Sequence, residues 1–271
     1  MARSATALCI PELAWLLDAG AVVWSGKPEA VFVTHGHSDH SCRVPAFVSR
    51  QKPPRFIVPA ETTSFVKRYL TAAQELTNHA EFTEESRREW VPNHTLEGVT
   101  PGQTIDLLQN RVARVIECHH SVPCVGYSFF ERRQKLLPEF VGQPGQAIAA
   151  ARKAGQNVTE TVELPLFAFL GDTTAEVFRS SPQLLEMPVV ICECSFLGDD
   201  ERANAERTRH TLWSDLRPHV EAHPDTTFVL IHFSARYSPS DVRAFFRKEA
   251  VPNVVPFIPD DSDHVSPPPT E

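Results

Sequence analysis

Three features are missing from this 271-residue chain, and each absence excludes a class of protein. No apolar segment approaches the roughly 20 residues that a membrane-spanning helix requires, and runs such as Phe228 to Ile231 have the length of a strand. The six cysteines contain no CxxC pair, so we expect reduced thiols rather than a disulfide framework. An excess of positive charge is also missing, because the formal net charge is −8, and the chain therefore has no general attraction for nucleic acid.

The N-terminal segment has only a weak likeness to an export signal. Arg3 precedes a short apolar stretch, but Pro11, Glu12 and Asp18 interrupt it. We therefore expect a cytoplasmic protein, or a nuclear one if the source is eukaryotic. The hydrophobic content of 42% is sufficient for the core of one large domain or of two small ones.

Short runs rich in Val, Ile and Phe recur along the chain, which is typical of buried strands. The expected strands are 31–34, 56–58, 112–118, 126–130, 167–170, 189–194 and 227–233. Helical periodicity predicts helices at 61–76 and 211–222, and a third helix that starts at Ser238-Pro239. The apolar side of the first helix would consist of Phe65, Tyr69, Ala72, Ala73 and Leu76. Strands with and without intervening helices are mixed, which favours an α/β sandwich over a doubly wound sheet.

The domain organisation follows from two stretches that break the strand pattern. The segment 131–162 is polar, contains glycine and has helical character, so we expect an insertion into one domain that spans residues 1–258. Residues 259–271 are predicted to form a disordered tail. Two local basic groups would be either a nucleic-acid face or an ordinary solvated surface: Arg132, Arg133 and Lys135, and then Arg202, Arg207 and Arg209.

The residues at 34–40 read Thr-His-Gly-His-Ser-Asp-His and directly follow an apolar strand. Packing does not explain three imidazoles and one carboxylate in six positions, so this HxHxDH loop predicts a metal site. His35 and His37 can bind one ion, and Asp39 and His40 can bind a second. Nitrogen and oxygen ligands without thiolate suit Zn²⁺, with Mn²⁺ or Fe²⁺ as alternatives.

Three further candidate ligands stand at the ends of predicted strands, namely His120, Asp172 and His232. Each of them alone could be a core histidine, a turn aspartate or a capping group, but together they complete two ligand sets. The sets would be His35, His37, His120 and Asp172 for one ion, and Asp39, His40, Asp172 and His232 for the other. Asp172 would then bridge the ions. His119 competes with His120, and spacing alone does not decide between them.

With these motifs in place, the sequence resembles the ribonuclease Z (tRNase Z, short form) family of the metallo-β-lactamase superfamily. The resemblance runs from about residue 7 to residue 258. The motifs that carry it are HGHSDH (35–40), HSVPCVGY (120–127), FLGDTT (169–174), ECSF (193–196), His210-Thr211 and HFSARY (232–237). The alignment of HSVPCVGY with the family pattern selects His120 over His119.

The resemblance implies a fold, a cofactor and an activity. The fold would be a metallo-β-lactamase αββα sandwich of two mixed sheets flanked by helices, with two Zn²⁺ per chain. The activity would be hydrolysis of precursor tRNA at the 3′ trailer, which leaves a 3′-hydroxyl on the tRNA, and the protein would be a homodimer. Asp39 would orient the attacking water, and His210, held by Glu193, would protonate the departing oxygen. Arg236 and Tyr237 would contact the substrate, although a fold-stabilising ion pair suits Arg236 equally well.

One departure from the family keeps an alternative function open. The segment 131–162 is short, so the resemblance implies a reduced form of the arm with which bacterial members clamp the tRNA elbow. This departure and the acidic composition favour a small-molecule metallohydrolase, such as a phosphodiesterase, lactonase or thioesterase of the same fold. The Glu193/His210 pair and HFSARY oppose that alternative. A non-catalytic binding module would be expected to have lost metal ligands, whereas all seven are present.

Overall fold

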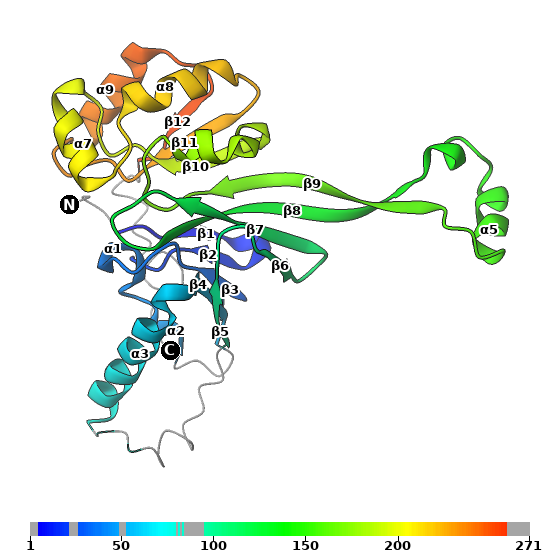
Figure 1. Cartoon of the computed structure of the whole chain (residues 1–271), viewed down its shortest axis with the longest axis horizontal. Helices are drawn as coiled ribbons and strands as arrows, with labels where there is room; N and C mark the ends of the chain where they lie inside the picture. The colour runs from blue at the N-terminus through cyan, green and yellow to red at the C-terminus, as the bar shows by residue number, and fades with distance from the viewer. Residues whose placement is uncertain are drawn as a thin grey trace, which may run out of the picture.

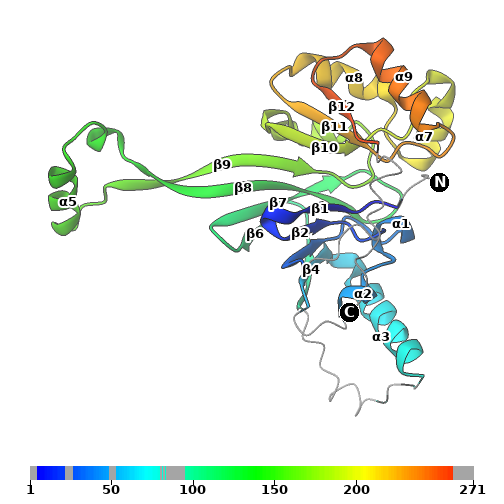
Figure 2. The ribbon, with the colours of Figure 1, turned by 180° about the vertical axis from the view of Figure 1, so that it is seen from behind.

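The structure is a computed structural model that describes residues 5–21, 27–48, 53–79, 81, 83 and 95–258. Its strands form two mixed sheets that pack face to face, and the helices cover their outer faces (Figure 1, Figure 2). This arrangement confirms the predicted αββα sandwich. The predicted tail, 259–271, lies outside the described residues.

The first sheet has the strand order β1-β2-β3-β4-β5. β1 is antiparallel to β2, and the other neighbours are parallel. Its strands are β1 (Leu8–Ile10), β2 (Trp15–Leu17), β3 (Ala30–Phe32), β4 (Arg55–Pro59) and β5 (Thr95–Val99). The helices on its side of the molecule are α1 (Ser38–Ser41), α2 (Pro45–Val48) and α3 (Thr63–Asn78), with short 3-10 turns at Pro11–Leu13 and Ala60–Thr62.

The second sheet has the order β12-β11-β10-β9-β8-β7-β6, parallel from β12 to β9 and antiparallel from β9 to β6. Its strands are β6 (Thr104–Leu107), β7 (Arg111–Cys118), β8 (Cys124–Leu136), β9 (Thr159–Phe169), β10 (Val189–Glu193), β11 (Thr227–Ile231) and β12 (Val254–Pro256). The helices are α5 (Gly145–Lys153), α6 (Val177–Ser180), α7 (Arg202–Thr208), α8 (Trp213–Ala222) and α9 (Pro239–Glu249), with 3-10 turns at Pro138–Phe140, Pro182–Glu186 and Asp199–Glu201. Each of the seven predicted strands and three predicted helices therefore overlaps an observed element.

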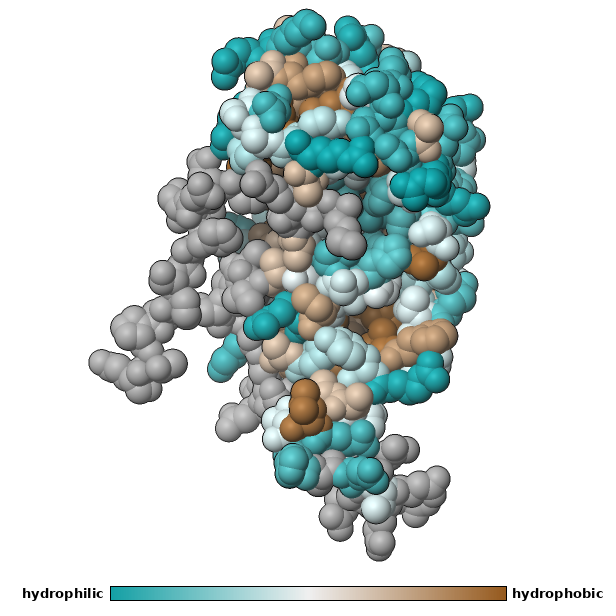
Figure 3. All heavy atoms as spheres, turned by 90° about the vertical axis from the view of Figure 1, so that its left-hand side faces the viewer, coloured by the Kyte–Doolittle hydropathy of each residue, from teal (hydrophilic) through white to brown (hydrophobic). Residues whose placement is uncertain are grey.

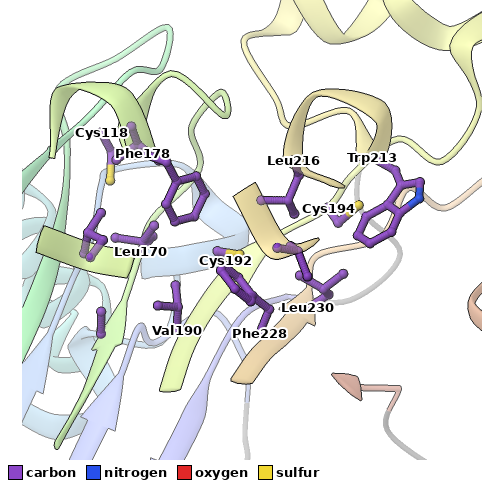
Figure 4. Packing of buried hydrophobic residues seen from close by; sticks show 14 of the residues in the cluster. Cys118, Leu170, Phe178, Val190, Cys192, Cys194, Trp213, Leu216, Phe228 and Leu230 are labelled. Atoms are coloured by element: carbon purple, nitrogen blue, oxygen red, sulfur yellow. The ribbon is translucent and has the colours of Figure 1, made fainter. Parts of the chain in front are cut away.

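The alternation of side chains along the central strands divides the core into layers. In β11, Phe228 and Leu230 pack against the helix layer, whereas Ile231 belongs to the cluster between the sheets. Figure 4 shows the outer cluster, to which α8 contributes Trp213 and Leu216. Each fully buried large apolar side chain of this kind contributes about 1.5–3 kcal/mol to the folded state. The six cysteines are free thiols, as predicted.

An aromatic cluster joins the two sheets directly below the metal-ligand loop. Trp15 and Phe32 of the first sheet meet Phe129 of the second at centroid distances of 4.9 Å each. The buried Tyr127 hydroxyl donates to the carbonyl oxygen of Val33 at 2.9 Å. Since Val33 comes just before the HxHxDH motif, this hydrogen bond fixes the start of the ligand loop relative to the second sheet.

The predicted insertion, 131–162, forms an arm that projects from the body of the molecule (Figure 1). β8 and β9 remain paired along it from the register shift at Phe129/Phe130 to the pair Leu136↔Thr159, and α5 lies at its tip. Arg132 forms ion pairs with Asp106 and Glu163 at the base of the arm. Arg133 pairs with Glu131, so these two basic residues are engaged with neighbouring carboxylates.

Helix α3 shows a difference from the predicted packing. The predicted apolar side is exposed, with Phe65 61% and Leu76 83% accessible, whereas Leu70 is 3% accessible. The helix packs on the first sheet through Leu70 and Val66, which lie on a neighbouring stripe of its surface. Figure 3 shows a face of the molecule on which apolar groups form separate patches among hydrophilic ones. Among the described residues, no helix is long and apolar enough to cross a membrane.

Candidate metal centre and active site

The HxHxDH loop lies at the carboxyl end of β3, where the chain turns into α1. His35 and His40 are buried, and the segment that follows β2 packs against the loop. The Ala19 N–H donates to the His40 carbonyl oxygen at 2.7 Å. A Cβ on Gly20 would lie 1.7 Å from the Asp39 carbonyl oxygen. Only glycine therefore allows the backbone at position 20 to pass this close to the ligand loop.

The structure brings the first predicted ligand set together. His35 Nε2 lies 3.1 Å from His37 Nδ1, and His120 Nε2 lies 3.3 Å from the same atom. Asp172 Oδ2 is 3.7 Å from His35 Nε2 and 3.9 Å from His120 Nε2. The four ligand atoms all lie within 4.8 Å of one another, so they can surround one ion.

The second predicted set adjoins the first. His232 Nε2 lies 3.6 Å from Asp39 Oδ2, and His40 Nε2 lies 4.0 Å from it. Asp172 approaches this set as well, with Oδ1 3.4 Å from His40 Nε2 and Oδ2 3.6 Å from His232 Nε2. Asp172 thus faces both sets, which is the position that a bridging ligand requires.

Two buried nitrogen atoms support a metal at this site. His40 Nε2 and His232 Nε2 have no hydrogen-bond partner in the described part of the chain. A buried polar group without a hydrogen-bond partner destabilises the folded state by about 1–3 kcal/mol. Two such nitrogen atoms that both face carboxylates therefore require an explanation. A divalent cation bound by these nitrogens and by the oxygens of Asp39 and Asp172 would explain the arrangement. The donor set of imidazole nitrogen and carboxylate oxygen fits such a cation.

Four of the five ligand histidines form a hydrogen bond through Nδ1, which leaves their Nε2 atoms directed at the cluster. A hydrogen bond to the outer ring nitrogen fixes the tautomer and the ring orientation of a metal ligand. The partners are Thr34 Oγ1 for His35 at 3.0 Å, Asp18 Oδ2 for His40 at 2.7 Å, the Arg209 carbonyl for His120 at 3.1 Å, and Ser195 Oγ for His232 at 3.0 Å. The site therefore has a built outer layer in addition to its ligands.

Asp18 is a functional residue that the sequence analysis missed. Its carboxylate is fully buried and accepts hydrogen bonds from Thr34 N at 2.7 Å, Thr34 Oγ1 at 2.9 Å and His40 Nδ1 at 2.7 Å. Burial lowers the pKa of His40, but the charge and hydrogen bond of Asp18 outweigh burial and raise it to about 9. The available signal was an acidic residue directly after the apolar run Trp15–Leu17, which we interpreted only as a break in a signal-like segment.

Glu193 and His210 form a second cluster beside the ligands. Glu193 ends β10 and is buried, and its Oε1 accepts from His210 Nδ1 at 2.8 Å and from Thr173 N at 2.8 Å. Its Oε2 accepts from Thr211 N at 3.1 Å and Ser195 N at 3.3 Å. Burial raises the pKa of Glu193, but the charge and hydrogen bond of His210 bring it down to about 2.

His210 faces both Glu193 and the metal-ligand cluster. Its Nδ1 lies 3.8 Å from Asp172 Oδ2. Burial lowers the pKa of His210, yet the charge of Glu193 and its hydrogen bond raise it to about 9. The raised pKa favours the protonated form of His210, whose Nδ1 is bound to Glu193.

Asp39 differs from the other ligands in its exposure. Its side chain is 37% accessible, whereas that of Asp172 is 4% accessible. The interaction with His232 and the charge of His40 lower the pKa of Asp39, despite partial burial. An ionised carboxylate at the open side of the cluster can both bind a cation and accept a proton.

The remaining predicted residues lie outside the ligand cluster. The Arg236 guanidinium pairs with the Glu201 carboxylate, and the Tyr237 hydroxyl accepts a hydrogen bond from Leu197 N at 3.2 Å. Both contacts tie the loop after β11 to the segment after β10. His119 turns toward Ser180, with Nε2 3.0 Å from Oγ, so the structure brings His120 and not His119 to the cluster.

Comparison with known sequences indicates the superfamily and the relatives that this chain resembles. The pattern of the Metallo-beta-lactamase superfamily matches residues 25–132. The chain is 28% identical over 247 residues to the chloroplastic tRNase Z TRZ2 of Arabidopsis thaliana, an alignment that covers 88% of this chain and 67% of that protein. It is 26% identical over 248 residues to tRNase Z TRZ1 of the same plant, with coverage of 88% and 84%.

Comparison with solved structures identifies the same fold. Human tRNase Z, short form, superposes with a TM-score of 0.55 at 17% identity, over 87% of this chain and 88% of that one. The metallo-beta-lactamase fold protein YhfI from Bacillus subtilis superposes with a TM-score of 0.54 at 13% identity, over 89% and 82%. The chain is thus similar to the metallo-β-lactamase superfamily over residues 25–132, and tRNase Z proteins are among the relatives that it resembles.

Proposed function

We propose that this protein is a metal-dependent endoribonuclease that removes the 3′ trailer from precursor tRNA and leaves a 3′-hydroxyl on the tRNA. The observation that carries the proposal is the Glu193–His210 pair beside the ligand cluster. The ligand cluster alone accounts for a hydrolase of the superfamily. The added pair supplies a proton donor, which the departing oxygen of a ribose requires and an activated ester does not. The tRNase Z relatives support the same conclusion.

We propose two Zn²⁺ per chain, with Mn²⁺ or Fe²⁺ as alternatives, held by the two ligand sets that share Asp172. When bound, the cations would make a hydroxide available near neutral pH and would stabilise charge on the phosphoryl oxygens. Nitrogen and oxygen donors without thiolate are the basis for preferring zinc.

The protein groups divide the proton transfers between them. Asp39 is ionised and lies at the open side of the cluster, so it would orient the attacking water and accept its proton. His210, whose pKa Glu193 raises, would donate a proton from Nε2 to the departing 3′-oxygen. Glu193 holds the imidazole in place and stabilises its positive charge. Positioned proton transfer of this kind contributes about 10²–10⁴-fold in rate.

The contacts with the substrate remain part of the proposal. We propose that the arm formed by β8, β9 and α5 contacts the tRNA body, because it projects away from the cluster (Figure 2). Arg236 and Tyr237 would also contact the substrate. They would use the N–H and O–H groups that are not engaged with Glu201 and Leu197. The resemblance to the family also leads us to propose a homodimer located in the cytoplasm or the nucleus.

The deciding experiment compares two substrates. Metal-loaded protein is incubated with a precursor tRNA that bears a 3′ trailer, and separately with bis(p-nitrophenyl) phosphate. We expect cleavage of the precursor to a tRNA with a 3′-hydroxyl and a trailer with a 5′-phosphate. Asp39→Ala should abolish this cleavage while tRNA binding persists, and the exposed Asp225→Asn should match the wild type. Cleavage of the model diester alone would overturn the assignment in favour of a small-molecule hydrolase.

A further inference from the structure

Arg209 ends α7 in a backbone conformation that favours glycine. Its φ is 55° and its ψ is 51°, in the left-handed region. Its N–H bonds to the Glu206 carbonyl at 3.4 Å, and the His210 N–H bonds to the Ala205 carbonyl at 3.1 Å. These two bonds form the helix-ending pattern in which a residue without a Cβ is preferred. A long charged side chain at such a position suggests a role that glycine could not fill.

Arg209 makes two separate hydrogen bonds with one metal-ligand residue. Its carbonyl oxygen accepts from His120 Nδ1 at 3.1 Å, and its Nη1 donates to the His120 carbonyl oxygen at 3.0 Å. The first bond fixes the imidazole ring, and the second fixes the backbone of the loop between β7 and β8. The two residues are 89 positions apart, so the paired contact closes a long-range connection.

The contact between Arg209 and His120 links a metal ligand to the segment that carries the proposed proton donor. His120 belongs to the metal-ligand set, and the residue after Arg209 is the proposed proton donor, His210. The His120 and His210 rings lie with their centroids 4.9 Å apart. Glu193 fixes the Nδ1 side of His210 from β10, and the hydrogen bonds described for it do not include one to the β7–β8 loop. Arg209 therefore provides a direct hydrogen bond between the loop that carries His210 and the loop that carries His120.

We propose that Arg209 is a positioning residue, which locks the loop that carries the proton donor to the loop that carries His120. The proposal rests on the proposed role of His210 as the acid. The guanidinium bond restrains the distance between the cluster, where the phosphoryl group would sit, and the donor. A displacement of about 1 Å in such a distance can reduce the rate by about 10²-fold. A partial loosening of one hydrogen bond should therefore reduce the turnover number by about 10-fold to 100-fold.

Three variants separate the side chain from the backbone. Arg209→Gly removes the guanidinium and keeps a backbone suited to the left-handed region, whereas Arg209→Ala removes the guanidinium and retains the strain. Arg209→Lys keeps one donor on a shorter side chain. The matched control is Arg207→Ala on the same helix, because the guanidinium of Arg207 bonds only to Asn204, at 3.3 Å, among the contacts described.

Kinetics on two leaving groups tests positioning directly. On precursor tRNA, Arg209→Gly and Arg209→Ala should lower kcat by at least 10-fold with KM and zinc content unchanged, and Arg209→Lys should recover part of the loss. On bis(p-nitrophenyl) phosphate, whose leaving group needs no proton, the same variants should keep the wild-type rate. Wild-type kcat in Arg209→Gly, a rise in KM alone, or loss of zinc in parallel with kcat would each overturn the proposal.

An NMR measurement on the metal-free protein tests the contact between Arg209 and His120 without any assay of tRNA cleavage. The ¹³C chemical shift of the His120 carbonyl and the ¹⁵N chemical shift of the following Ser121 amide report the hydrogen bond that the Arg209 guanidinium donates to this carbonyl. We expect these shifts to change in Arg209→Gly and to stay unchanged in Arg207→Ala. If the shifts change but the wild type does not cleave precursor tRNA, the proposed function fails while the connection stands. Unchanged shifts in Arg209→Gly would overturn the connection itself.

Discussion

The buried carboxylate of Asp18 permits a sharp test of how the metal site is built. Asp18→Asn preserves the size and shape of the side chain. The amide oxygen can replace Oδ1, which accepts from Thr34 N at 2.7 Å. The amide nitrogen must replace Oδ2, which lies 2.7 Å from His40 Nδ1. Since an NH₂ group only donates, His40 Nδ1 becomes an acceptor and the proton moves to Nε2, which faces the metal ligands.

The size of the effect follows from the hydrogen bonds that change. To bind a cation, His40 of the variant must lose the proton on Nε2 and carry it on Nδ1, opposite the donor NH₂ of the new residue. The NH₂ group and His40 Nδ1–H then face each other as two donors, at a cost of about 1–3 kcal/mol. Thr34 Oγ1, which donates to Oδ2 in the wild type, loses its acceptor with or without a cation and so does not change the difference. Because 1.4 kcal/mol corresponds to a factor of ten, metal affinity should fall by about 10-fold to 100-fold. This range agrees with the effect of removing the outer partner of a ligand histidine in other metal sites.

The assay is a competition titration of zinc against a chromophoric chelator at pH 7.5, with far-UV circular dichroism as a check of folding. The control is Asp225→Asn, an exposed substitution of the same chemistry, which should leave the affinity at the wild-type value. A folded Asp18→Asn protein whose zinc affinity lies within about threefold of the wild type would refute the tautomer argument. In that case Asp18 would support the fold and not the ligand.

Further predictions concern the acid pair and the ligand loop. His210→Ala should lower kcat on precursor tRNA by about 10²–10⁴-fold with zinc content unchanged, as measured by steady-state kinetics and metal analysis. In the metal-free protein, the pKa of about 9 for His210 means that its pairing with Glu193 stabilises the fold fully below pH about 6.5. This stabilisation is lost as the pH rises through about 9, so the difference in urea unfolding free energy between wild type and His210→Ala should become smaller between pH 7 and pH 10. Gly20→Ala should destabilise the protein by about 1–3 kcal/mol or more and weaken zinc binding, because the added Cβ meets the Asp39 carbonyl at 1.7 Å. Gly36→Ala, with nothing within 4 Å of the added Cβ, should leave thermal unfolding and zinc titration unchanged.

The metal ligands could be predicted from the sequence because they cluster locally and follow apolar strands. His35, His37 and His40 lie within one short loop, and His120, Asp172 and His232 each follow a recognisable strand. The carboxyl ends of the strands meet at one edge of the sandwich, so residues distant in sequence come together there. The choice of His120 over His119 required the resemblance to the family, because both histidines follow the same strand.

Other features depend on contacts that no local pattern encodes. Helix α3 has two apolar stripes, and periodicity selected the one through Phe65 and Leu76, whereas the sheet packs on the one through Leu70. Asp18 is recognisable as a site residue only after its contact with His40 is known, 22 positions away. The arm has the same limitation, because pairing between residues 131–136 and 159–164 follows from register and not from composition.

The position of the ligands explains why the fold and the site depend on each other. His35, His37, Asp39 and His40 extend from the first sheet, whereas His120, Asp172 and His232 extend from the second. Neither sheet alone can surround a cation, so the site exists only when the sandwich is assembled. Tyr127 makes this dependence direct, because it belongs to the second sheet and donates to Val33 just before the ligand loop of the first. A bound cation would in turn hold the sheets together, since its binding stabilises only the assembled state. The hydrogen bonds that orient the His40 and His232 imidazoles each come from the same sheet as the histidine, so each sheet carries part of the ligand geometry itself.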